Sequence, residues 1–402
     1  MKVKILPSEA FGSISAPPSK SMAHRLLIAS AMAEGESYID NLSLCDDVKA
    51  TLGCLEALGI EFARCGSGYK IFGRDFRKIT KADELFCNES GSTLRMLIPP
   101  ATLSGEEVIF TAKPGLLQRP MNIYENIYTA LGLSFKKKKN GYSVKGALPP
   151  GEYTVAGNVS SQFISGLIFA LAAYPEKSVI RITPPVESRS YIYMTLDAVR
   201  LFSVNAYFED ELTVVIEGGG YKPQNLSVEG DYSGAAFTDA LNLLGGRVCV
   251  SGLLENSRQG DHIYKELFKK LRDGRPTIDI TDCPDLAPIL FALASYLNGA
   301  CFTGTARLKI KESDRAAAMA DELSKVGGKL IIGENFVTVE KACLTAPAIP
   351  IDSHNDHRIV MAMAILLTKT GGEIHGAEAV DKSYPEFFAH LKELNINLET
   401  YD

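Results

Sequence analysis

Residues 19–35, SKSMAHRLLIASAMAEG, begin with a polar, cationic turn and continue as a helix that is apolar on almost every face. The same pattern occurs six times in all, at a period of about seventy residues apart from one shorter step. A helix that is apolar all round must be surrounded by protein. The sequence therefore predicts a repeat fold with six buried central helices, in the segments 19–35, 89–105, 158–174, 230–246, 283–299 and 355–372.

A second, amphipathic helix follows each central helix and is usually closed by glycine. Alternating strands then follow, and the stretches 60–72, 133–146 and 329–340 each read as a strand pair that turns at glycine or asparagine. The fourth repeat has Thr277–Ile280 as its only strand, which explains the shorter step. The second helices are expected in the segments 46–59, 118–132, 188–202, 260–274, 312–328 and 383–394.

A strand at the amino terminus is expected to complete the last repeat at the carboxyl terminus. The sixth repeat stops after one strand, Asn395–Tyr401, whereas Lys2–Leu6 is a strand with no repeat of its own. Closing the last repeat with the first strand places both termini in one lobe. With helices inside and sheets outside, the predicted fold class is a two-lobed, inside-out α/β barrel with three repeats of a mixed βα module in each lobe. The expected lobes are residues 19–229 and residues 1–18 with 230–402, joined by two crossings of the chain.

Composition excludes several classes of protein. A chain of 402 residues that is 46% hydrophobic can bury large cores. The net charge of −6 gives no support to nucleic-acid or membrane-surface binding, which needs a clustered basic face. Eight cysteines form no C-x-x-C pair and no spacing suited to zinc, so we expect reduced thiols and no metal. The longest apolar run, 163–174, is shorter than a membrane span, and the start MKVKILPSEAF lacks a signal-peptide core, which favours the cytoplasm.

Cations and small polar residues recur at the starts of these helices, where unpaired N–H groups and the helix dipole favour anions. For any single cation a solvated surface position is the better explanation, but the shared position within the repeats favours a common role. We expect the set to converge on a cleft between the lobes that binds phosphate and carboxylate. It comprises Lys20, Ser21, Arg25, Ser90, Gly91, Ser92, Arg95, Ser160, Ser161, Gln162, Asp285, Asp356, His357 and Arg358, with Arg119, Arg189, Lys311, Glu312, Arg315 and Lys382 from the second helices.

Two acids stand among these cations. Asp285 opens an apolar helix, where its role could be to cap N–H groups. Glu312 lies between Lys311 and Arg315, where it could be a salt-bridged acid at a helix start. If the two acids face each other across a closed, anion-loaded cleft, they form instead an acid/base pair whose pKa values the surroundings set apart.

Eight short motifs, spread over the whole chain, resemble those of the 3-phosphoshikimate 1-carboxyvinyltransferase (EPSP synthase) family. The most specific are PPSKSxxxR at 17–25 and NDHR at 355–358. The others are SGSTLR at 90–95, QRP at 118–120, SSQ at 160–162, PDLA at 284–287, KESDR at 311–315 and DKSYPEFF at 381–388. The family's fold, two inside-out α/β lobes of three modules each, agrees with the repeat pattern.

The resemblance implies transfer of the enolpyruvyl group of phosphoenolpyruvate to the 5-hydroxyl of 3-phosphoshikimate, through a tetrahedral addition–elimination intermediate, in aromatic amino-acid biosynthesis. It also implies no cofactor, no nucleic-acid or membrane partner, and a monomer. Asp285, as base, and Glu312, as acid, are the expected catalytic residues, with Lys20 stabilising the leaving phosphate. By similarity 3-phosphoshikimate is bound by Lys20, Ser21, Arg25, Ser160, Ser161, Gln162, Ser188, Asp285 and Lys311, and phosphoenolpyruvate by Lys20, Gly91, Arg119, Gln162, Arg315, Arg358 and Lys382.

The chain departs from the family pattern at three positions. Glu89 stands where asparagine is common, and Ser92 replaces threonine. An acid beside a phosphate pocket is unexpected, so Glu89 is left out of the predicted site. Arg307 stands where an asparagine that touches substrate is common. That contact is therefore not carried over.

Three alternative functions share parts of this pattern. The sister transferase that acts on UDP-N-acetylglucosamine relies on a cysteine in the loop ahead of its Arg-Pro, and the equivalent loop here, AKPGLLQRP at 112–120, has none. RNA 3′-phosphate cyclase uses related modules but needs a basic surface. A non-catalytic anion-binding relative is the third alternative, and the presence of both Asp285 and Glu312 argues against it.

Overall fold

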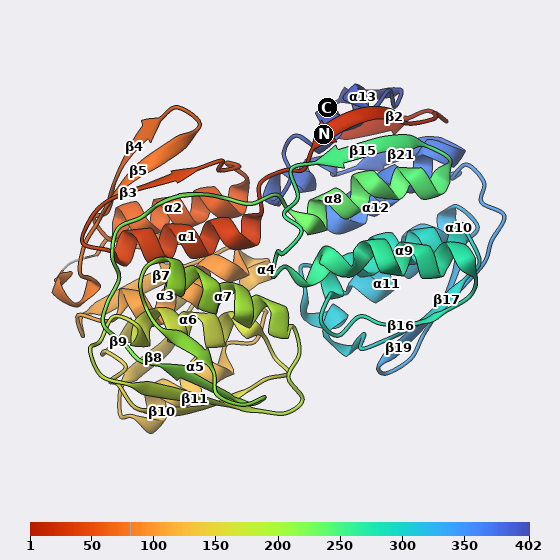
Figure 1. Cartoon of the computed structure of the whole chain (residues 1–402). Coiled ribbons are helices and arrows are strands. Elements are labelled where there is room, and N and C mark those ends of the chain that lie inside the picture. Colours follow the sequence, from red (N-terminus) through yellow and green to blue (C-terminus); the bar gives the residue numbers. More distant parts are fainter. Residues whose placement is uncertain (81) are drawn as a thin grey trace. The chain divides into compact units, whose positions relative to one another are not determined.

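The computed structural model of the chain describes residues 1–80 and 82–402. The chain folds into two compact units (Figure 1). The first unit is Lys20–Glu229, and the second unit combines Met1–Ser19 with Gly230–Asp402. The chain passes from one unit to the other twice, before Lys20 and after Glu229. Both termini belong to the second unit.

The six predicted central helices are all present, three in each unit. In α1 every residue from Met22 to Met32 is buried, as expected for a helix enclosed by protein. Most of these helices begin at a polar cap, which fixes where the helix starts: the side chains of Ser90, Ser160, Asp231 and Asp356 each accept a backbone N–H of the following turn. The central helices are α1 (Lys20–Met32), α3 (Gly91–Ala101), α6 (Ser161–Leu171), α8 (Tyr232–Asp239), α10 (Ala287–Tyr296) and α12 (His357–Thr370).

The second helices are also present, and each buries one face only. In α9 the buried residues Tyr264, Leu267, Phe268 and Leu271 follow the spacing of a single helical stripe. The second helices are α2 (Asp46–Ala57), α5 (Asn122–Ala130), α7 (Arg189–Leu201), α9 (Tyr264–Asp273), α11 (Arg315–Lys325) and α13 (Phe387–Glu393), and a one-turn helix, α4 (Pro114–Leu117), precedes α5.

The described residues, 1–80 and 82–402, form five four-stranded sheets and one two-stranded sheet. Each four-stranded sheet has the same order: two parallel strands, then two strands that continue the sheet antiparallel, and in four of the five sheets these two strands form a hairpin. In the first unit the sheets are β14 (Asn225–Ser227), β3 (Gly35–Asp40), β5 (Gly68–Gly73), β4 (Glu61–Cys65); β6 (Leu85–Phe86), β7 (Glu107–Thr111), β9 (Gly141–Lys145), β8 (Ser134–Lys138); and β10 (Glu152–Ala156), β11 (Ser178–Thr183), β13 (Thr213–Ile216), β12 (Ala206–Phe208).

The second unit carries the two incomplete repeats that the sequence predicts. The fourth repeat lacks a hairpin, so its sheet is only β15 (Arg247–Ser251) beside β2 (Phe11–Ser15). The remaining sheets are β16 (Thr277–Asp279), β17 (Ala300–Thr303), β19 (Phe336–Glu340), β18 (Lys329–Ile332), and β20 (Ile351–Asp352), β21 (Gly372–His375), β1 (Lys2–Ile5), β22 (Leu398–Tyr401).

The first strand closes the last repeat. β1 pairs antiparallel with β21 and with β22, so that Lys2 faces both His375 and Tyr401. It therefore occupies the place that the inner hairpin strand fills in the complete repeats. The prediction that both termini meet in one sheet is confirmed.

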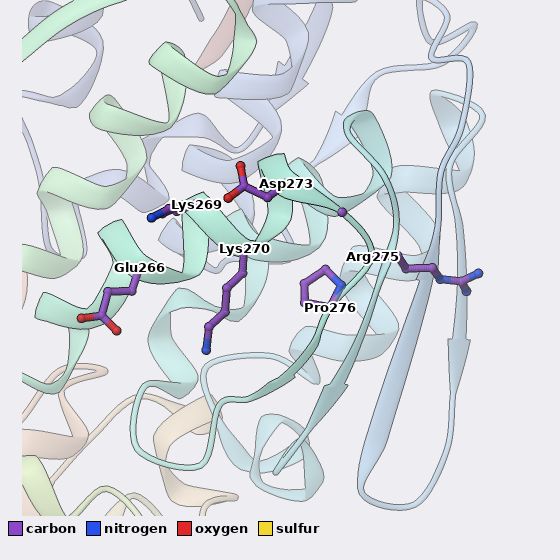
Figure 2. Close-up of a pocket in the computed structure, with 7 residues that line it drawn as sticks. Glu266, Lys269, Lys270, Asp273, Arg275 and Pro276 are labelled. Carbon is purple, nitrogen blue, oxygen red and sulfur yellow. The ribbon is translucent and has the colours of Figure 1, made fainter.

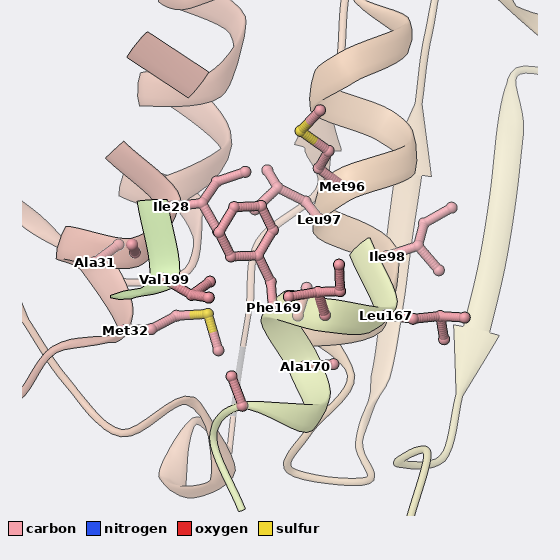
Figure 3. Packing of buried hydrophobic residues seen from close by; sticks show 14 of the residues in the cluster. Ile28, Ala31, Met32, Met96, Leu97, Ile98, Leu167, Phe169, Ala170 and Val199 are labelled. Carbon is pink, nitrogen blue, oxygen red and sulfur yellow. The ribbon is translucent and has the colours of Figure 1, made fainter. Parts of the chain in front are cut away.

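Each unit has its own hydrophobic core. Figure 3 shows part of the core of the first unit, where side chains from three central helices point toward one another. Ile28 of α1, Leu97 of α3 and Phe169 of α6 are each fully buried. The central helices pack against one another, which holds their polar starts in fixed positions. No helix of the part of the chain that the structure describes is long and apolar enough to cross a membrane.

Candidate functional site

Lys20, the first residue of α1, has an internal partner that the sequence analysis missed. Its Nζ donates to Oδ2 of Asp47 at 2.8 Å, and only 14% and 13% of the two side chains are exposed. Asp47 lies in the first turn of α2, where an acid stabilises the helix start. Lys20 is therefore held by a carboxylate before any anion arrives.

Gly91, Arg95, Arg119 and Gln162 form one cluster in the first unit. Arg95 donates from Nη1 to Oε1 of Gln162 at 2.9 Å and from Nη2 to the carbonyl of Pro120 at 3.0 Å. Gly91 lies against this group, since a Cβ built on it would come within 3.2 Å of Nη1 of Arg119 and 3.4 Å of Oε1 of Gln162. The structure thus brings together two starts of central helices and the Gln-Arg-Pro turn, as the repeat pattern predicts.

Arg25 is almost completely buried, with 1% of it exposed. Its guanidinium donates to Oγ1 of Thr195 at 2.8 Å and to the carbonyls of Ser21 at 2.6 Å and Tyr191 at 2.8 Å. Burial lowers the pKa of Arg25 to about 10. Three of the five N–H groups of an arginine are thereby used within the protein.

Three of the predicted serines, Ser160, Ser161 and Ser188, lie at the starts of α6 and α7 in the first unit. Ser160 caps α6, where its Oγ accepts the backbone N–H of Gln162 at 3.3 Å, and Ser161 is the first residue of that helix. Ser188 precedes α7 in the left-handed conformation, with φ of 55°, and is 2% exposed. A non-glycine residue in this conformation is strained, which is common at binding sites.

In the second unit Asp285 is surrounded by cations. Its Oδ1 accepts from Lys311 at 3.2 Å and from Arg315 at 2.7 Å, and its Oδ2 accepts from Arg358 at 2.9 Å. Burial alone raises the pKa of this carboxyl, but the charges of Arg358, Lys311 and Arg315 outweigh burial and hold the pKa well below its usual range. The residues at the N-cap positions of the 3-10 turn Pro284–Leu286 and of α10, Cys283 and Leu286, make no side-chain cap hydrogen bond, and the capping role considered for Asp285 stays a prediction.

Arg315 connects the two predicted catalytic acids. It is 1% exposed and donates from Nη1 to Asp285 and from Nη2 to Oε2 of Glu312, each at 2.7 Å. Its Nε donates to Oδ2 of Asp356 at 2.9 Å. Burial lowers the pKa of Arg315, but the three carboxylates outweigh it and raise the pKa well above the usual value.

Asp285 and Glu312 both belong to the second unit, and they bind the same guanidinium. The salt bridge of Glu312 with Arg315 is present, and it coexists with the grouping of the two acids. Asp356, which completes the set around Arg315, belongs to the helix-start residues that the sequence predicts for the cleft, although no role in binding or catalysis was assigned to it. Its side chain also caps α12.

The loop before α12 is tied to the end of the sixth repeat. His354 and Asn355 both have positive φ, 48° and 52°, and the carbonyl of Asn355 accepts from Nζ of Lys382 at 2.6 Å. Glu322 of α11 also binds this loop. Its carboxylate accepts the backbone N–H of Asp352 at 2.9 Å and contacts Nε2 of His354 at 2.8 Å. Lys382 and Arg358 are thus both held at the start of α12.

Two grooves lie apart from these groups. One, of about 710 Å³, is lined by the C-terminal half of α9 and the turn after it, and Figure 2 shows its mixed charges, among them Glu266, Lys270 and Arg275. The other, of about 570 Å³, lies in the first unit beside the Gln118 end of α4. Within residues 1–80 and 82–402 no group of three or more His, Cys, Asp or Glu side chains is placed to hold a metal ion.

Comparison with known proteins matches the chain over nearly its whole length. The model of the EPSP synthase (3-phosphoshikimate 1-carboxyvinyltransferase) family matches residues 7–391. The 3-phosphoshikimate 1-carboxyvinyltransferase of Clostridium novyi is 37% identical over 98% of this chain and 97% of that protein, and the enzyme of the same name from Clostridium kluyveri is 36% identical over 99% and 98%.

The fold is shared with a solved structure, EPSP synthase from Acinetobacter baumannii, with a TM-score of 0.79 and 22% identity over 99% of this chain and 100% of that chain. The predicted inside-out α/β fold is therefore confirmed. The family match and the relatives agree with the motifs at the starts of the helices. The chain belongs to the EPSP synthase (3-phosphoshikimate 1-carboxyvinyltransferase) family.

Proposed function

We propose that the residues gathered at the helix starts carry out the reaction of the family in this chain. Membership of the family makes the chain an enzyme of aromatic amino-acid biosynthesis whose substrates are phosphoenolpyruvate and 3-phosphoshikimate. The enzyme transfers the 1-carboxyvinyl group to the 5-hydroxyl and releases phosphate. The observation that carries the residue roles is the buried network in which Asp285 and Glu312 share Arg315.

The proposed mechanism has two steps. In the addition, the 5-hydroxyl oxygen forms a bond to C2 of phosphoenolpyruvate while Asp285 takes the hydroxyl proton and Glu312 protonates C3, which gives a tetrahedral ketal. In the elimination, the carboxylate of Glu312 takes a proton back from C3, the double bond to C2 forms again, and the bond from C2 to the phosphate oxygen breaks while the proton held by Asp285 passes to the departing phosphate. Lys20 stabilises the charge on the departing phosphate.

The cations around Asp285 suggest how this carboxylate becomes a base. With three cations on its oxygens, its pKa lies well below the usual range, so the carboxylate is a poor base. Anionic substrates compete for Arg358 and Lys311. The carboxylate that loses these partners regains basicity, so binding of the substrates prepares the acceptor of the hydroxyl proton.

The other proposed roles follow the same grouping. Gly91, Gln162 and Arg119 lie together, which supports a shared role in binding one substrate. The residues proposed for phosphoenolpyruvate are Lys20, Gly91, Arg119, Gln162, Arg315, Arg358 and Lys382, and those proposed for 3-phosphoshikimate are Lys20, Ser21, Arg25, Ser160, Ser161, Gln162, Ser188, Asp285 and Lys311. We expect no cofactor, because phosphoenolpyruvate is itself an activated donor.

One assay tests the proposed function. Purified protein is mixed with phosphoenolpyruvate and 3-phosphoshikimate, and phosphate release is followed, with UDP-N-acetylglucosamine and 3′-phosphorylated RNA as alternative acceptors. Release with 3-phosphoshikimate alone is the expected result. Release with UDP-N-acetylglucosamine, or with none of the three, would contradict the proposal.

Gly91→Ala is expected to raise the KM for phosphoenolpyruvate. The new methyl group comes within 3.2 Å of Nη1 of Arg119, so the arginine must move by a few tenths of an ångström. Crowding of this kind corresponds to a rise in KM of about tenfold. Steady-state kinetics with varied phosphoenolpyruvate measures it.

Gly115→Ala is the matched control for Gly91→Ala. Gly115 lies in α4 of the same unit, and a Cβ there meets no atom within 4 Å. Its KM is expected to stay at the wild-type value. Equal effects of the two substitutions would show that Gly91 has no special place beside Arg119.

We also infer that the enzyme works as a monomer in the cytoplasm. All eight cysteines are free thiols, which fits a reducing compartment. Sedimentation of the purified protein tests the monomer, and a dimer at micromolar concentration would refute it.

A further inference from the structure

Asp261 is a buried carboxylate that the proposed mechanism does not use. It lies in the 3-10 turn Gly260–Ile263 that leads into α9, and only 3% of it is exposed. Its Oδ2 accepts a hydrogen bond from the hydroxyl of Ser233. Its Oδ1 meets no hydrogen-bond donor among residues 1–80 and 82–402. A buried carboxylate with one unsatisfied oxygen is costly and needs an explanation.

Ser233 links this carboxylate to Arg358. The hydroxyl of Ser233 donates its proton to Asp261 and accepts from Nη1 of Arg358 at 2.8 Å. Nη2 of the same guanidinium donates to Oδ2 of Asp285 at 2.9 Å. Arg358 therefore lies between two carboxylates, one in direct contact and one reached through a hydroxyl group.

Charged groups from three elements face Asp261. Asp231 stands before α8, Asp285 lies in the 3-10 turn before α10, and Arg358 lies in α12, while the thiol of Cys283 is also near. Burial, followed by the charge of Asp285, raises the pKa of Asp261 to about 7, although Arg358 and the Ser233 hydroxyl act in the opposite direction. Asp261 can thus change charge near neutral pH.

We propose that Asp261 is a positioning residue that fixes Arg358 through Ser233 and sets how strongly this arginine attracts an anionic substrate. When Asp261 is protonated, Asp285 is the main negative charge beside Arg358. When Asp261 is ionised, a second negative charge faces the same guanidinium. The inference rests on the proposed role of Arg358 in binding phosphoenolpyruvate, whose phosphate and carboxylate compete with that second charge.

The sign of the pH effect follows directly. Substrate anions bind best while Asp261 is neutral, so binding weakens as pH rises through about 7. The pH dependence that phosphoenolpyruvate itself causes is the same for all variants, and it cancels when they are compared. Binding of the substrate near pH 7 also draws a proton onto Asp261.

The test compares the wild-type enzyme with Asp261→Asn, in which the side-chain oxygen can still accept from Ser233 but the charge is gone. The KM for phosphoenolpyruvate is measured from pH 6 to 8.5 at saturating 3-phosphoshikimate. Over this range the KM of the wild type is expected to rise about tenfold more than that of Asp261→Asn, which corresponds to one pKa unit of coupling. At pH 6 the two values of KM should agree, and kcat should change much less than KM.

Asp273→Asn is the matched control, since Asp273 is an exposed carboxylate at the other end of α9. Its KM profile is expected to follow the wild type. Identical profiles for the wild type and Asp261→Asn would overturn the inference, as would a loss of kcat without a change in KM. A wild-type enzyme that releases no phosphate with 3-phosphoshikimate would contradict the proposed function instead.

Ser233→Ala gives an independent reading that does not depend on the stability of the Asp261 variant. It keeps the carboxylate and removes the bridge, so Arg358 loses one acceptor. At pH 6 the KM for phosphoenolpyruvate is expected to rise about fivefold, the usual scale for one lost hydrogen bond, and its further change with pH should follow that of Asp261→Asn rather than that of the wild type. An unchanged KM in a folded Ser233→Ala variant would show that Asp261 does not act on Arg358 through the hydroxyl.

Calorimetry adds a readout that needs no turnover. The heat of phosphoenolpyruvate binding in the presence of 3-phosphoshikimate is measured at pH 7 in buffers of different ionisation enthalpy. The wild type is expected to take up more protons than Asp261→Asn. Equal proton uptake by the two proteins would count against the inference.

Discussion

Asp285→Asn is expected to lower kcat at least about a hundredfold, the usual scale for the loss of a group that transfers a proton. The substitution removes the proposed acceptor of the hydroxyl proton. It also removes the negative charge that three cations share, so Arg358, Lys311 and Arg315 repel one another more strongly. Single-turnover measurement of phosphate release separates the chemical step from product release.

Asp282→Asn is the matched control for this substitution. Asp282 is an exposed carboxylate three residues earlier in the same turn. It should retain nearly full activity, since a solvated carboxylate contributes little to its surroundings. If a folded Asp285→Asn variant turns over within threefold of the wild type, Asp285 is not the base.

Lys20→Met is expected to reduce kcat at least about a hundredfold as well, because a positive charge directed at the leaving phosphate is lost. The methionine side chain has a similar length and keeps the packing at the start of α1. The substitution also leaves the carboxylate of Asp47, which Lys20 contacts at 2.8 Å, without this cation. Steady-state and single-turnover kinetics with both substrates measure the effect.

Two further variants separate a role on substrate from a role in the ion pair. Asp47→Asn breaks the pair but keeps the lysine, so its activity should fall only a few fold, about the value of one weak ion pair. Lys49→Met removes an exposed lysine that pairs with Asp46 at 3.6 Å on the same helix, and it should be neutral. If Asp47→Asn loses as much activity as Lys20→Met, the pair itself is what matters.

The architecture could be predicted because its signals are local and repeated. The alternation of an enclosed apolar helix, an amphipathic helix and a turning strand pair is visible in segments such as 19–35 and 60–72. The missing hairpin of the fourth repeat and the unpaired strand at Lys2–Leu6 were equally visible in the sequence. The strand at the amino terminus, β1, lies between β21 and β22, where its backbone N–H and C=O groups find hydrogen-bond partners. Periodicity of this kind depends only on the neighbouring residues in the chain.

Partners of individual side chains could not be predicted in the same way. Lys20 was expected to await an anion, and the structure gives it Asp47, which lies one repeat element further along. Asp261 reaches Arg358 through the hydroxyl group of Ser233, and Ser233 lies 125 residues before the arginine in the chain. Such partners depend on how the helices pack in three dimensions, which the hydrophobic spacing along the chain does not encode.

By itself, the sequence determined the repeat, the place of the termini and the motifs that identify the family, because hydrophobic period and helix-start chemistry are properties of short segments. Only the tertiary structure decided that Asp285 and Glu312 bind one arginine, and that this arginine, Arg315, is enclosed by three carboxylates. The physical reason is that charge balance in a buried network is set by distances between segments far apart in the chain. The sequence names an aspartate such as Asp285 but does not show how many cations surround its carboxylate.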